Sequence, residues 1–158
     1  RRTLLVRSFG KADIHALFEA LGEVEGTCAR LAASRMTRVD IDALWQLVED
    51  GERRPDDFND INRRFHDLLH AGAGNVILRD VVRDLQLRSL PLRAVQFRLR
   101  HDRVGTSQEK HRAIAGAIEK RDGPLAERLM VQHIAATKQV ILGLKCAGPA
   151  EAEDGERH

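Results

Sequence analysis

The chain has few aromatic side chains and no tyrosine: five phenylalanines and one tryptophan are its only aromatic residues. Proteins that bind single-stranded nucleic acid stack the bases on aromatic side chains, and this chain offers little material for that. Its formal net charge of +2 is close to balanced and does not indicate a basic binding surface either. We therefore expect that this chain does not itself contact nucleic acid.

Cysteine and long apolar runs are also scarce. The two cysteines, Cys28 and Cys146, form neither a zinc-type spacing nor a disulfide framework, which favours a reducing, cytoplasmic setting. We expect Cys28 to pack in the core, because it lies on an apolar stripe. The longest apolar runs are far shorter than the ~20 residues of a spanning helix. The basic start at Arg1 precedes only three apolar residues, so we expect no signal peptide.

Motifs of helical metalloenzymes are missing. The sequence contains no Glu-x-x-His pair and no His-Glu-x-x-His motif. We also expect no inward-facing carboxylate that could act as a general base on the apolar stripes. The prediction is that the chain is not an enzyme, with a metal-dependent hydrolase or oxidase in a helical bundle as the rival interpretation.

Apolar residues recur at three- and four-residue spacing along most of the chain, and this pattern predicts helices. We expect an all-α, antiparallel bundle of six or seven helices in one domain, with a short strand-like segment at 3–7 before it. Expected starts are a cap at Asp13 and capping boxes at Thr37 and Thr106. Pro91 should kink or divide the fourth helix near Ser89. The expected helices are 13–34, 37–49, 55–71, 75–103, 106–120 and 123–145.

Three histidines lie on the predicted inward faces of three different helices: His66, His111 and His133. Asn62 precedes His66 by one helical turn, and His70 extends the same row by another turn. Three imidazoles and an amide oxygen suit a divalent first-row metal, with positions left for water or a small carboxylate. The alternative is three separate core histidines, each hydrogen-bonded to a backbone carbonyl.

The same residues form a known pattern. The ordered set resembles the C-terminal ligand-sensing (FCD) domain of the FadR branch of the GntR family of bacterial transcription regulators, and the likeness covers roughly residues 13–144. The spacings from His66 to His111 (111 − 66 = 45) and from His111 to His133 (133 − 111 = 22) match that domain's layout. The segments that carry the likeness are Asn62-x-x-x-His66, Gly74-Asn75, Glu109-Lys110-His111 and Met130-Val131-Gln132-His133.

The resemblance implies a bundle at 10–145 that binds a metal, often zinc or nickel, and a small organic acid beside it. It implies a homodimer that passes the signal to a winged helix-turn-helix domain bound to operator DNA. Residues 1–9 resemble the end of that domain, and 146–158 are expected to be a disordered tail. A structural metal-binding dimerisation domain is the other alternative.

Two positions depart from the family pattern. Asn62 stands where the first ligand is commonly Asp, which should weaken cation binding. Leu21 stands where many relatives carry an Arg that reaches the effector's carboxylate. We therefore expect either a less acidic effector or one that is held by other side chains, and the candidates are Arg88, Arg93, His70 and Gln96.

Overall fold

The computed structural model describes residues 10–99 and 103–146, and these form α-helices joined by short connections. No strand occurs in the described ranges, and none of their helices is long and apolar enough to cross a membrane. The expected all-α bundle is confirmed, while the strand-like segment at 3–7 and the tail beyond 146 lie outside the described residues. The elements are α1 (Lys11–Arg35), α2 (Arg38–Arg53), the 3-10 helix η1 (Pro55–Asp57), α3 (Phe58–Gly72), α4 (Val76–Leu99), α5 (Arg103–Glu119) and α6 (Gly123–Cys146).

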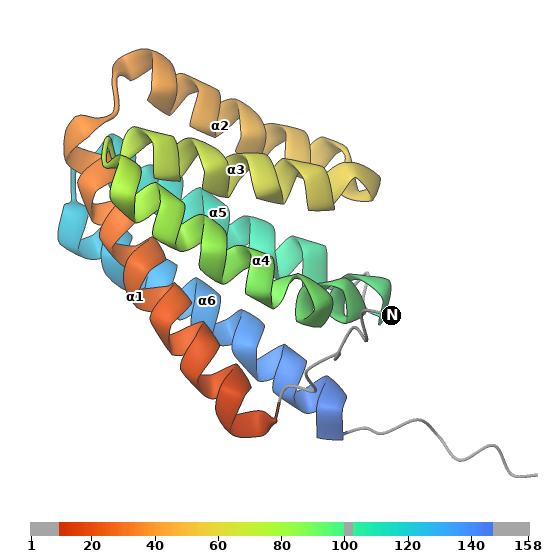
Figure 1. Ribbon diagram of the computed structural model, residues 1–158. Helices are drawn as coiled ribbons and strands as arrows, with labels where there is room; N and C mark the ends of the chain where they lie inside the picture. Colours follow the sequence, from red (N-terminus) through yellow and green to blue (C-terminus); the bar gives the residue numbers. More distant parts are fainter. Residues whose placement is uncertain (1–9, 100–102, 147–158) are drawn as a thin grey trace, which may run out of the picture.

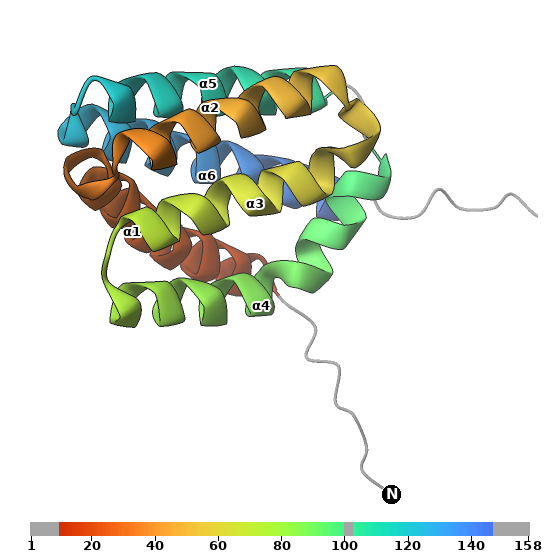
Figure 2. The same ribbon diagram turned by 90° about the horizontal axis from the view of Figure 1, so that it is seen from above.

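The first and last helices pack side by side, and the middle helices cover them. α1 makes its most extensive contacts with α6, whereas α2 packs on α3 and α5 (Figure 1). Seen from above, α3 runs between α2 and α4 (Figure 2). This arrangement brings α1, α3, α5 and α6 around one apolar core, in which Phe18, Phe65 and Met130 are almost completely buried.

The starts of the first two helices follow capping chemistry, although the cap of the first differs from the expectation. The capping box at Thr37 is confirmed, because Asp40 N donates to Thr37 Oγ1 at 3.2 Å and Thr37 N donates to Asp40 Oδ2 at 2.8 Å. The predicted cap at Asp13 is wrong. α1 begins earlier, with Gly10 as the N-cap, and Asp13 accepts from Gly10 N at 3.0 Å.

The second helix was expected to end at residue 49, with a turn before the next helix at 55, but α2 continues past Gly51 to Arg53. Gly51 is buried inside the helix, and a Cβ built on it would lie 1.7 Å from Gln108 Nε2. The glycine therefore serves the close approach of α2 and α5, and does not mark a turn. Pro55 starts η1, so α3 itself begins at Phe58.

α4 starts as predicted and bends as predicted. Gly74 has a left-handed backbone (φ 60°), and Asn75 Oδ1 accepts from Ile77 N and Leu78 N at 3.1 Å each. Pro91 lies inside the helix without dividing it, and Figure 2 shows α4 changing direction along its length.

The predicted capping box at Thr106 is wrong, because α5 already begins at Arg103. Within this helix Gln108 turns inward, where its Nε2 donates to Val48 O at 3.1 Å. The expected connection at Asp122 is confirmed. Asp122 Oδ1 accepts from Leu125 N at 2.9 Å at the start of α6.

Candidate metal centre

Three buried imidazoles meet in the core, one from each of α3, α5 and α6. His66 is 2 %, His111 1 % and His133 4 % exposed. Each offers a ring nitrogen within 4.8 Å of those of the other two, and the Nε2 atoms of His66 and His133 lie 3.3 Å apart. The structure therefore brings together the three histidines that the sequence pattern singled out.

His111 is held in place by its neighbours on two sides. Its ring stacks on Phe65 with centroids 4.3 Å apart, and its Nδ1 lies 3.0 Å from Gln108 Oε1. Because Gln108 uses its amide nitrogen on Val48 O, its Oε1 faces His111 and accepts a hydrogen bond from Nδ1–H. The Nε2 lone pair is then left buried with no hydrogen-bond partner. A buried acceptor of this kind is what a metal ion would satisfy.

The electrostatics keep His111 in its neutral, ligand form. Burial lowers the pKa of its imidazole well below the ordinary range, and the neighbouring His133 and His66 lower it further. A neutral imidazole is the form that binds a metal ion.

Asn62 is also buried, one turn before His66 on α3. Its role as the fourth ligand stays a prediction. The chemistry of the whole set, three imidazole nitrogens and an amide oxygen, fits a divalent first-row metal.

Glu25 on α1 is the residue that the sequence reasoning missed, since no inward carboxylate was expected. It is fully buried, with Oε2 at 2.5 Å from His66 Nδ1 and 3.4 Å from His70 Nε2. Its Oε1 accepts from Gln86 Nε2 of α4 at 3.2 Å. The signal was available: Glu25 lies four residues after Leu21 and three before Cys28, on the buried face of α1.

Glu25 is ionised in this setting. Burial by itself would raise the pKa of its carboxyl, but the charge of His66 and the hydrogen bonds from His66 and His70 hold the pKa well below its usual range. The core therefore contains a carboxylate next to the three-histidine cluster, and Glu25, His66 and His70 form a second group of possible ligands.

The side chains expected to bind an effector do not, where the structure describes them, gather in one place as the three histidines do. His70 is buried beside Glu25, whereas Arg88 is exposed on α4. The side chains of Arg93 and Gln96 lie outside the described residues. Of this set, the structure brings His70 alone among the described side chains into contact with the buried cluster.

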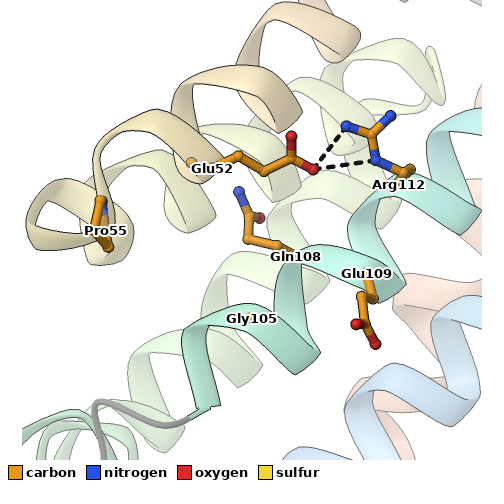
Figure 3. Close-up of a pocket in the computed structure, with 7 residues that line it drawn as sticks. Glu52, Pro55, Gly105, Gln108, Glu109 and Arg112 are labelled. Atoms are coloured by element: carbon orange, nitrogen blue, oxygen red, sulfur yellow. Dashed lines mark hydrogen bonds and ion pairs between the residues drawn. The ribbon is translucent and has the colours of Figure 1, made fainter.

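A pocket of about 420 Å³ opens between the end of α2 and the start of α5 (Figure 3). Glu52, Gln108 and Arg112 are among its lining residues, and Arg112 is engaged with Glu52 at 2.7 Å. Gln108 thus lies between this pocket and His111.

Residues 16–136 match the FCD domain family. The chain belongs to that family. Among curated proteins, the FCD chain is 29% identical over 119 residues to the HTH-type transcriptional repressor RspR of Escherichia coli K12. It has the same identity to the HTH-type transcriptional regulator YdfH of Shigella flexneri, which is uncharacterised. The alignment covers 70% of this chain and 50% of each relative, so the chain spans about half the length of these relatives.

Two solved structures share the fold. The E. coli protein McbR/YncC superposes with a TM-score of 0.80 at 15% identity, over 87% of this chain and 71% of the other. A GntR protein of Streptococcus agalactiae gives a TM-score of 0.63 at 22% identity, over 85% and 62%. The predicted FCD domain of a GntR-family regulator is confirmed by the family match and these relatives.

Proposed function

We propose that this FCD domain senses a small organic acid beside a bound divalent metal and passes the signal to a winged-helix DNA reader. The observation that carries the proposal is the meeting of His66, His111 and His133 from three helices. With Asn62 they would hold zinc or nickel, and three or four protein ligands leave room for a further ligand.

The buried Nε2 of His111 supports a metal over three independent core histidines. In the alternative interpretation each imidazole would find a backbone carbonyl. Instead, His66 contacts a carboxylate, His111 contacts an amide, and the Nε2 atoms of His66 and His133 face each other at 3.3 Å. Two ring nitrogens this close share either a hydrogen bond or a cation, and a cation would also satisfy the buried Nε2 of His111.

A carboxylate effector suits this centre because a metal held by neutral ligands keeps its positive charge. Arg88, Arg93, His70 and Gln96 remain the proposed effector contacts. The effector would act by favouring one arrangement of a homodimer, with a coupling of typically about 1–3 kcal/mol.

DNA binding is proposed for the longer protein. The relatives named above are HTH-type regulators, and this chain spans about half of their length. A winged helix-turn-helix domain would occupy the remainder and contact operator DNA in the cytoplasm. We propose no catalysis, because both oxygens of Glu25, the one carboxylate in the described part of the cluster, are already engaged by side chains.

The test is thermal unfolding of metal-stripped protein with and without Zn²⁺ or Ni²⁺. Metal should raise the melting temperature, and His111→Ala with His133→Ala should abolish the gain. An unchanged melting temperature in the wild-type protein would contradict the metal site. Acetate and succinate should then add stability to the metal-loaded protein but not to the stripped protein; equal effects on both would contradict an effector site at the metal.

A further inference from the structure

Glu25 is a fully buried carboxylate that the proposed sensing function leaves without a role. We propose that Glu25 is a positioning residue of the metal site, which orients His66 and supplies the negative charge that Asn62 does not. The inference rests on the proposed metal site and adds a group from a fourth helix, α1.

The contact geometry fixes which nitrogen of His66 faces the cluster. Glu25 Oε2 lies 2.5 Å from His66 Nδ1, and an ionised carboxylate can only accept a hydrogen bond. Nδ1 is therefore the nitrogen that carries a proton and donates to Glu25, and Nε2 is the nitrogen left for a metal ion. That Nε2 is the atom 3.3 Å from His133 Nε2. A carboxylate that holds one imidazole nitrogen in this way orients the other toward a metal and raises its basicity.

Such a group would offset part of the charge of a bound divalent ion. Three neutral imidazoles and an amide carry no charge, so a divalent cation among them would keep its full charge in a buried environment. Glu25 is one imidazole away from the ligand position and lowers the net charge of a loaded site to +1. This remaining charge still attracts one carboxylate of an effector.

Two more side chains hold the carboxylate, one from α4 and one from α3. Gln86 Nε2 of α4 donates to Oε1 at 3.2 Å, and His70 Nε2 of α3 lies 3.4 Å from Oε2. With both oxygens engaged, Glu25 stands behind His66 as a partner of the ligand, and the site keeps its three imidazoles for the ion. The competing role is a plain ion pair between Glu25 and a protonated His66, which would have no connection with metal.

The decisive variant is Glu25→Gln, which keeps the size of the side chain and removes its charge. Zinc affinity of stripped protein is measured by competition with a chromophoric chelator. We expect a loss of about 10- to 100-fold, the usual effect of removing an outer-shell partner. Asn62→Asp in the Glu25→Gln background should restore most of it by returning an anion. Glu23→Gln, the same charge change at a position of α1 outside the buried cluster, should leave affinity unchanged.

The outcomes separate this inference from the metal site itself. Zinc bound equally well by the wild type and Glu25→Gln overturns the role of Glu25 and leaves the metal site standing. A loss that Asn62→Asp does not restore overturns the charge argument. Wild-type protein that binds no zinc overturns both the metal site and this inference.

A second measurement needs no variant, in case Glu25→Gln does not fold. Long-range ¹H–¹⁵N NMR of histidine-labelled wild-type protein with zinc reports the state of each ring nitrogen. A proton on Nδ1 of His66 with zinc on Nε2 supports the proposal. Zinc on Nδ1, or a ring that keeps both protons after zinc is added, overturns it.

Discussion

At the scale of single residues, the candidate metal centre depends on contacts made behind the three histidines. Gln108 is a clear example: it holds His111 through Oε1 and is itself tied to the backbone of α2 through Nε2. Its place is possible only because residue 51 has no side chain. A glycine that local reasoning assigns to a turn is in fact part of the support of a candidate ligand.

Gly51→Ala should therefore destabilise the protein by about 1–3 kcal/mol, the typical effect of overpacking, and weaken zinc binding by displacing Gln108. Urea unfolding and chelator competition check the two effects. The matched control is Gly116→Ala on α5, where an added Cβ meets nothing within 4 Å. That variant should be neutral or slightly stabilising. Equal stability of the two variants would contradict the packing argument.

The pH dependence of the metal-free protein follows from the same cluster. The pKa of His111 is lowered in the folded state, so below the ordinary value of about 6.5 the unfolded chain binds a proton that the folded chain does not. Stability should fall as the pH drops through that region. The lowered pKa of Glu25 acts in the same direction at lower pH, below its usual value of about 4.3.

Urea unfolding of stripped protein at several pH values below neutrality measures this trend. His111→Phe keeps a ring against Phe65 without the titrating group, and it should flatten the dependence near pH 6.5. A wild-type protein whose stability is constant between neutrality and pH 5 would count against the buried, neutral His111.

The role of Cys28, unlike that of Gly51, was predicted correctly from its local sequence. Burial, together with the charge of Glu25, raises the pKa of its thiol to about 11. A thiol that stays protonated at neutral pH is a packing group, as its place on the apolar stripe predicted.

At the scale of elements, the helix ends decide how α4 joins the bundle. Gly74 and Asn75 turn the chain and cap α4, and Gln86 ties α4 to Glu25. Removal of the cap leaves two backbone N–H groups of the first turn without their acceptor.

Asn75→Ala should lower the free energy of unfolding by about 0.5–2 kcal/mol, as measured by urea denaturation. Asn59→Ala, an exposed asparagine in the first turn of α3, is the control and should change stability by less than about 0.5 kcal/mol. A loss no larger than that of the control would show that the Asn75 cap contributes nothing.

The boundaries of elements were the least predictable feature. The capping box at Thr37 was found correctly, yet an equally good sequence signal at Thr106 lies inside α5. A capping signal competes with continued helix, and at Thr106 the helix continues back to Arg103.

At the scale of the whole molecule, a metal bound by α3, α5 and α6 would link three helices that are distant in sequence. Binding to the folded state alone stabilises it by an amount set by concentration and affinity. All three helices would be stabilised together, because none of them holds a complete site by itself.

Zinc should therefore slow amide hydrogen exchange in α3, α5 and α6 together, including amides remote from the histidines. Mass spectrometry of exchange in stripped and loaded protein measures this. His111→Ala should lose the protection in all three helices. Protection confined to α3 in the wild type would indicate that His66 and its neighbours bind zinc without the other two helices.

The sequence alone determined the helical class, the approximate positions of the helices and the three histidines on inward faces, because periodic burial is a local property of the chain. It also carried the family pattern. Only the tertiary structure decided that the three imidazoles meet, that Gly51 makes room for Gln108, and that Glu25 of α1 reaches His66. These depend on how helices far apart in sequence pack against one another, and no spacing within a single helix encodes the position of a side chain on another.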